Sequence, residues 1–153
     1  MWYLNIHQST VLFLAITPET TAKHMIKHFI RGYNGSRDLL IILDSSGSIG
    51  KTAFHKSLDD IYKLISVMCP SPEPFVKSNS HGYNQLALLQ FSTGVKTSIT
   101  FGEVGSLSQI KGKLNSIEHM AGTTCTEKAL SEAIKNIDLG KILIVIKVNS
   151  SKT

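Results

Sequence analysis

The chain has 153 residues, enough for about one domain, and 42% of them are hydrophobic while 18% are charged. This composition excludes a collagen, a coiled coil and a disordered tail of low hydrophobicity. The net charge is +5, but the 16 Lys and Arg residues are spread among acidic ones, so nucleic acid is not the expected partner. No apolar run approaches the roughly 20 residues that a membrane-spanning helix needs, so no membrane span is expected.

Residues 1–36 are interpreted as an N-terminal extension. Its apolar run, 11–16, has six residues, and the first cation of the chain, Lys23, follows this run. A secretory leader has a positive region first, then a longer apolar stretch and a small-residue cleavage site. The segment therefore matches a leader only weakly.

A helix is predicted over about 18–31, because Thr17 can cap it and Pro18 suits the first helical position. His24 and His28 lie one helical turn apart on its polar face. Two imidazoles at this spacing suit zinc, but a zinc site needs three or four protein ligands and no third is visible. A solvated helix face is the favoured interpretation.

From residue 37 the predicted order is strand, helix, strand, strand, helix, helix, strand. Continuous apolar runs, typical of parallel strands covered on both faces, predict strands at 39–43, 86–91 and 142–146. Alternating apolar and polar residues predict an antiparallel edge strand at 95–101. Helical spacing of apolar residues predicts helices over 54–68, 107–117 and 129–137. Together these elements predict an α/β fold with an open, mostly parallel, doubly wound sheet and one antiparallel edge strand.

Ligands of such sheets bind at the carboxyl ends of the strands, so the turn after the strand 39–43 is the first candidate site. One interpretation is a phosphate loop, because Gly50-Lys51-Thr52 matches the second half of that motif. Against it, Ser45 stands where the first glycine belongs, and the carboxylate of Asp44 would repel a phosphate.

The other interpretation is a divalent cation site. Asp44, Ser46 and Ser48 form the pattern Asp-x-Ser-x-Ser, one carboxylate and two hydroxyls, with Gly47 allowing a sharp turn between the serines. Hard cations such as Mg²⁺ prefer oxygen ligands of these kinds. A second hydroxyl-rich loop, Ala121-Gly-Thr-Thr-Cys-Thr126, precedes the predicted helix 129–137.

Four motifs in this order resemble the von Willebrand factor type A (vWA) domain from residue 37 to about 148. They are the first strand with DSSGSIG, the strand end QFST, the antiparallel strand, and GTTCTEKAL. The resemblance implies a Rossmann-like fold with a metal-ion-dependent adhesion site, in which Asp44, Ser46, Ser48 and Thr124 hold Mg²⁺, Mn²⁺ or Ca²⁺. It also implies that residues 37–153 are a partial vWA domain, incomplete at the C-terminus.

Two departures from the family pattern modify these expectations. The family carries a further Asp after the next strand, and Val148 stands at that position here. Loss of a carboxylate near a dication implies a weakened affinity for the metal. In addition, the strand 141–147 is expected to have a bare outer edge, which predicts self-association through it.

The expected function is a divalent-cation-dependent protein-binding module of the adhesion or extracellular matrix type, whose partner supplies an acidic side chain to the metal. An enzyme is not expected, because neither Ser46 nor Ser48 lies in a Gly-x-Ser-x-Gly turn. An extracellular or secreted location is expected, and the sequons at Asn34 and Asn149 favour it slightly.

Two alternatives stay open at this point. The first is an intracellular, cytoplasmic vWA scaffold with a weakened or empty metal site, which the absence of a convincing leader favours. The second, less favoured, is a nucleotide binder of the phosphate-loop kind. Cys69 and Cys125 show no metal-ligand spacing, and their redox state is left open.

Overall fold

The computed structural model describes residues 3–6, 9–15, 38–68, 71–75, 85–136 and 142–147. In chain order its elements are β1 (Tyr3–Ile6), β2 (Ser9–Ala15), β3 (Asp38–Asp44), α2 (Lys51–Met68), β4 (Gln85–Phe91), β5 (Val95–Ile99), α3 (Leu107–Asn115), α4 (Thr126–Asn136) and β6 (Ile142–Lys147). From β3 onward this order confirms the prediction. The helix predicted over about 18–31 lies outside the described residues.

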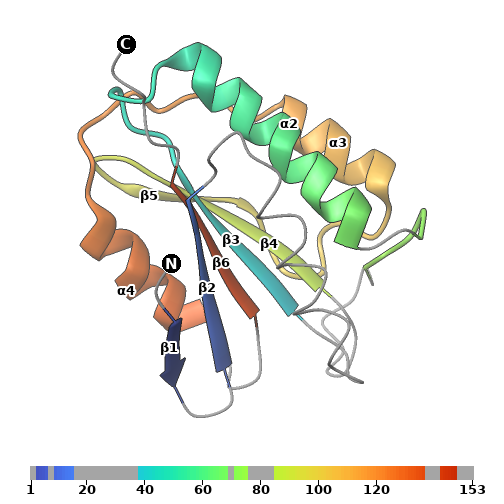
Figure 1. The fold of residues 1–153 in the computed structure, drawn as a ribbon. Coiled ribbons are helices and arrows are strands. Elements are labelled where there is room, and N and C mark those ends of the chain that lie inside the picture. Colours follow the sequence, from blue (N-terminus) through green and yellow to red (C-terminus); the bar gives the residue numbers. More distant parts are fainter. Residues whose placement is uncertain are drawn as a thin grey trace.

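The strands form one six-stranded sheet in the order β1-β2-β6-β3-β4-β5 (Figure 1). The four inner strands are parallel, while β5 pairs antiparallel with β4 at one edge. The predicted open, mostly parallel α/β sheet with this antiparallel edge strand is confirmed. The other edge adds two strands that were not predicted, β1 and β2, which pair antiparallel with each other.

The prediction of a bare edge on the strand 141–147 is wrong. β2 pairs in parallel along β6, from Val11 opposite Leu143 to Ala15 opposite Lys147. This ladder uses the backbone groups that were expected to be open for self-association, and β1 becomes the outer strand. The apolar run 11–16, which was interpreted as a weak leader, overlaps β2.

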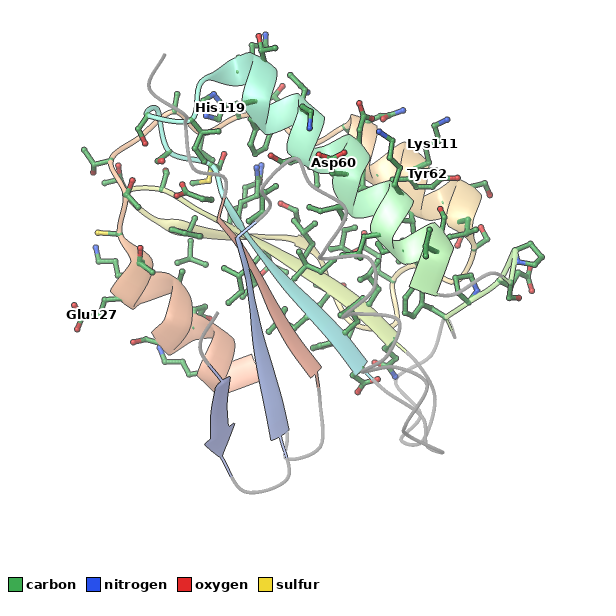
Figure 2. The ribbon with its side chains drawn as sticks, viewed as in Figure 1. Asp60, Tyr62, Lys111, His119 and Glu127 are labelled. Atoms are coloured by element: carbon green, nitrogen blue, oxygen red, sulfur yellow. The ribbon has the colours of Figure 1, made fainter. Side chains whose placement is uncertain are left out.

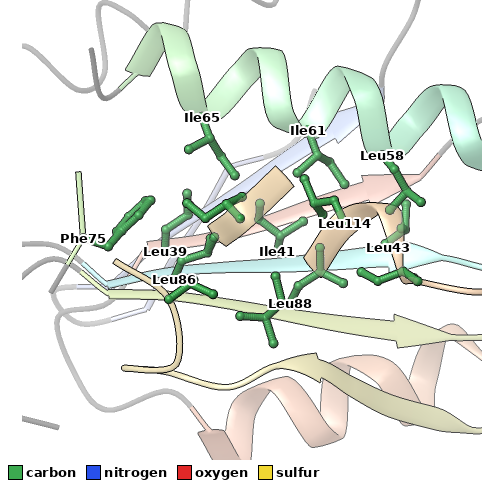
Figure 3. Packing of buried hydrophobic residues seen from close by; sticks show 14 of the residues in the cluster. Leu39, Ile41, Leu43, Leu58, Ile61, Ile65, Phe75, Leu86, Leu88 and Leu114 are labelled. Carbon is green, nitrogen blue, oxygen red and sulfur yellow. The ribbon is translucent and has the colours of Figure 1, made fainter. Parts of the chain in front are cut away.

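Helices cover both faces of the sheet, with α2 and α3 on one side and α4 on the other (Figure 1). Alternate side chains of β3 therefore enter different hydrophobic clusters, since successive residues of a strand point to opposite faces. Leu39, Ile41 and Leu43 pack beneath α2 and α3 (Figure 3), and Leu40 and Ile42 pack with Ala129 of α4. Complete burial of such a side chain contributes about 1.5–3 kcal/mol. Among the described helices, none is both long and apolar enough to cross a membrane.

The predicted alternation along 95–101 is wrong in one respect, because β5 contains a bulge. Ile99 lies opposite Leu88 and Thr97 opposite Leu89, so Ser98 is an extra residue between two successive pairs. As a result, Ile99 joins the cluster under α2 while Val95 packs in the cluster on the α4 side. The single apolar face expected from the sequence is divided between both layers.

Gly112, in the middle of α3, offers a test of the helix. An added Cβ would meet nothing within 4 Å, so Gly112→Ala should raise the free energy of unfolding by about 0.5–1 kcal/mol through helix propensity. Gly102→Ala is the matched contrast: its φ of 77° is strained for alanine, and stability should fall. Urea unfolding measures the stability of both variants. A higher stability for Gly102→Ala would contradict the positive φ of Gly102.

Glu103 makes part of the stability dependent on pH. Hydrogen bonds from Lys113 and from the backbone N–H of Thr100 hold its pKa below the ordinary value of 4.5. The stabilisation is therefore complete above that value and is lost as the pH falls through the lower pKa of the folded state. Glu103→Gln should flatten the decline in unfolding free energy between about pH 5 and pH 3. The exposed Glu73→Gln is the control, and an unchanged acid profile for Glu103→Gln would refute the assignment.

Candidate metal centre

The first loop begins where β3 ends and contains three of the predicted ligands. Asp44 is 2% exposed, and its Oδ1 accepts the backbone N–H of Ser46 at 2.9 Å, which closes a side-chain turn. The Oγ atoms of Ser46 and Ser48 lie 3.0 Å apart. Gly50 then takes a φ of 74° before α2 starts at Lys51. Carboxylate and hydroxyls are thus gathered in one short turn.

The loop before α4 lies directly against this turn. Ser46 and Gly122 form an isolated parallel bridge, in which the N–H of Gly47 donates to the carbonyl of Gly122 at 2.8 Å. The N–H of Ala121 donates to the carbonyl of Ser45 at 3.0 Å. Two segments separated by more than 70 residues in sequence therefore run side by side at the carboxyl end of β3.

Thr124, the fourth predicted ligand, is exposed and follows this bridge by two residues. Its neighbours fix the course of the loop. The N–H of Thr123 donates to Thr93 Oγ1 at 3.0 Å, and the N–H of Cys125 donates to the carbonyl of Ser92 at 2.9 Å. The loop between β4 and β5 is therefore a third component of the site. Whether Thr124 is a metal ligand stays a prediction.

Two glycines permit the close approach of the loops. A Cβ on Gly47 would lie 2.9 Å from the carbonyl oxygen of Ala121, and one on Gly122 would collide with Thr93 Oγ1. Gly47 was expected to supply a sharp turn between the serines, but among the described glycines only Gly50 and Gly102 have a positive φ. The absence of a side chain at Gly47 therefore matters because it leaves room for the backbone of Ala121.

Gln90 holds the loops of the candidate site together, and sequence reasoning assigned it no role. It is fully buried, and its Nε2 donates to the carbonyl of Glu118 at 2.9 Å and to Ser45 Oγ at 3.4 Å. Its Oε1 accepts a hydrogen bond at 2.8 Å from the hydroxyl of Ser98, the extra residue of the bulge in β5. An amide that interrupts the apolar run 86–91 was the available signal, because a buried polar group must find partners.

His119 was also not assigned a role from the sequence. It lies beside the first turn of α2 in Figure 2, and its Nε2 is 2.9 Å from the carbonyl oxygen of Ser46. The half phosphate loop weighed earlier, Gly50-Lys51-Thr52, forms the start of α2, with Lys51 and Thr52 exposed.

The donor set suits a hard cation. Among the described residues, the only hydrogen bond to the Asp44 carboxylate is on Oδ1, which leaves Oδ2 for another partner. Hydroxyl and carboxylate oxygens are ligands for Mg²⁺, Mn²⁺ or Ca²⁺. The described part of the chain has no group of three or more His, Cys, Asp and Glu side chains that could hold a metal ion, so the candidate site combines a single carboxylate with hydroxyl groups. Val148 lies outside the described residues.

Comparisons with known proteins identify the family of the chain. Residues 38–142 match the family model of the von Willebrand factor type A domain. Integrin alpha-X of Mus musculus is 29% identical over 120 residues, which are 72% of this chain and 9% of that protein. The collagen alpha-1(VI) chain of Xenopus laevis is 33% identical over 107 residues, or 67% of this chain and 10% of that one. The chain thus spans about a tenth of these relatives.

Solved structures show the same fold at low sequence identity. Proximal thread matrix protein 1 from the mussel byssus, solved with a zinc-occupied MIDAS motif, superposes with a TM-score of 0.60 at 20% identity. The match covers 78% of this chain and 33% of that one. BatB from Bacteroides thetaiotaomicron has a TM-score of 0.53 at 16% identity, over 72% of this chain and 52% of that one. The match to the family model covers more than half of this chain. The chain therefore belongs to the von Willebrand factor type A domain family.

Proposed function

We propose that this chain is a divalent-cation-dependent protein-binding module of the adhesion or extracellular matrix type. The observation that carries the proposal is the backbone bridge between Ser46 and Gly122. It joins the loop of Asp44, Ser46 and Ser48 to the loop of Thr124. This bridge supports the proposal that oxygen ligands from both loops serve one ion.

Each residue has a distinct role in this proposal. Ser46, Ser48 and Thr124 offer neutral hydroxyl oxygens, and Asp44 contributes negative charge through Oδ2. A bound Mg²⁺ or Mn²⁺ supplies a concentrated positive charge that this single carboxylate does not neutralise. An acidic side chain of a protein partner would complete the ligand set, since a hard cation prefers carboxylate oxygen. This role needs no nucleophile, and His119 bonds to the Ser46 carbonyl rather than to a serine hydroxyl.

The kinds of relatives support the class of partner and the location. Integrin alpha-X, a collagen VI chain and a byssus thread matrix protein are similar to this chain over 72%, 67% and 78% of its length, respectively. We infer an extracellular setting and a protein partner on this basis. Val148 in place of the family's later Asp favours a weaker metal affinity, and an empty site would favour the alternative of a metal-independent scaffold.

Asp44→Asn tests the charge at the site. Asparagine keeps an oxygen that can accept the Ser46 N–H, so the turn should persist while the attraction for the ion falls. We expect Mn²⁺ affinity, measured by titration calorimetry, to fall by more than about tenfold, or about 1.4 kcal/mol. Asp59→Asn, an exposed carboxylate on α2, is the matched control and should bind as the wild type does. Equal affinity in both variants would refute a role for Asp44.

Gly122→Ala tests the approach of the loops. The new Cβ would clash with Thr93 Oγ1 and lie 2.8 Å from Ser92 Oγ and 3.2 Å from the backbone nitrogen of Thr93, so the two hydroxyls or the loops themselves must shift. We expect a loss of about 1–3 kcal/mol in stability, together with weaker Mn²⁺ binding by the fraction that folds. Gly94→Ala in the neighbouring turn is the control, because its Cβ would meet nothing within 4 Å. Wild-type Mn²⁺ affinity in Gly122→Ala would argue against a site shared by the two loops.

A further inference from the structure

The side chain of His119 is held on two sides. Its Nε2 lies 2.9 Å from the carbonyl oxygen of Ser46, and its ring lies against Phe54 with centroids 4.9 Å apart and planes inclined by 32°. Phe54 is fully buried in α2, so it provides a fixed surface for the ring. A carbonyl oxygen can only accept, and Nε2 must therefore carry the proton in this contact.

The backbone on either side of His119 is anchored as well. The carbonyl of Glu118 accepts Gln90 Nε2–H at 2.9 Å, and the N–H of Met120 donates to Ser45 Oγ at 2.8 Å. The backbone from which the imidazole extends toward Ser46 is therefore already held in place. Little conformational entropy is left to lose when the hydrogen bond forms.

The contact acts on the peptide that carries a proposed metal ligand. The N–H of Ser46 is held by Asp44, and its carbonyl is held by His119 and by the N–H of Ile49 at 3.2 Å. With both peptide groups fixed, the Cα–Cβ bond of Ser46 has a defined direction. Its hydroxyl is then directed toward Ser48, 3.0 Å away, before any ion arrives.

We propose that His119 is a positioning residue of the cation site, which fixes the Ser46 peptide so that its hydroxyl is preorganised for the metal. This role rests on the proposed function, because it concerns the affinity of the same site. Partners that orient metal ligands from outside the coordination shell change metal affinity by about 10- to 100-fold when they are removed. His119 lies 73 residues from Ser46 in sequence, and it acts through a backbone oxygen rather than through a ligand side chain.

Two substitutions separate the hydrogen bond from the ring contact. His119→Phe keeps an aromatic ring against Phe54 but removes the donor, and His119→Gln removes the ring but keeps an N–H donor at a similar reach. Calorimetric titration with Mn²⁺ should show an affinity lowered about tenfold or more in His119→Phe and largely retained in His119→Gln. Urea unfolding in the presence of a chelator measures the stability of each metal-free protein separately.

The control for a merely structural effect is Gly102→Ala, which should lower stability without changing Mn²⁺ affinity. Wild-type affinity in His119→Phe would overturn the positioning role while leaving the proposed function intact. Absence of Mn²⁺ binding in the wild type would overturn the proposed function, and this role with it. Should His119→Phe fail to fold, His119→Gln is compared with His119→Asn, whose shorter amide cannot reach Ser46. A lower Mn²⁺ affinity in His119→Asn than in His119→Gln supports the positioning role, and equal Mn²⁺ affinities overturn it.

Discussion

Ser45 lies at the end of β3, fully buried, and its backbone and hydroxyl hold together the loops on which the site depends. Its N–H donates to the carbonyl of Phe91 at 2.7 Å, and its carbonyl accepts the N–H of Ala121. Its hydroxyl oxygen accepts the N–H of Met120. An unsatisfied polar group in such a dry position costs about 1–3 kcal/mol, so separating any one loop from Ser45 is unfavourable. This constraint fixes where the candidate metal ligands can lie.

The site is built in two levels. The buried level consists of Ser45 and Gln90, which are hydrogen-bonded to each other and to the backbone of the loop before α4. The outer level presents the exposed hydroxyl residues Ser48 and Thr124 to solvent. In the proposed site, the outer oxygens would need little rearrangement to receive an ion, because the hydrogen bonds of the buried level hold the loops together. The side exposed to solvent would then be free for an acidic group of a partner.

The sheet depends on a contact between the two ends of the described chain. β2 and β6 are separated by more than 120 residues, yet they pair in parallel and β2 covers the flank of β6. A short apolar run such as 11–16 is equally compatible with a strand and with a weak leader when taken alone. Its partner strand is not encoded in its own pattern, so the edge of the sheet was assigned incorrectly to the strand 141–147.

The sequence by itself determined the elements from β3 onward and the motif of the first loop. Continuous apolar runs and helical spacing are local signals. The consecutive residues Leu40 and Ile41 of β3 are buried on opposite faces of the sheet, as the apolar run predicted. Only the tertiary structure decided the bulge at Ser98, the place of β2 and the contact of His119 with Ser46. Each of these depends on a hydrogen-bond partner supplied by a distant segment, and periodicity along the chain carries no information about such partners.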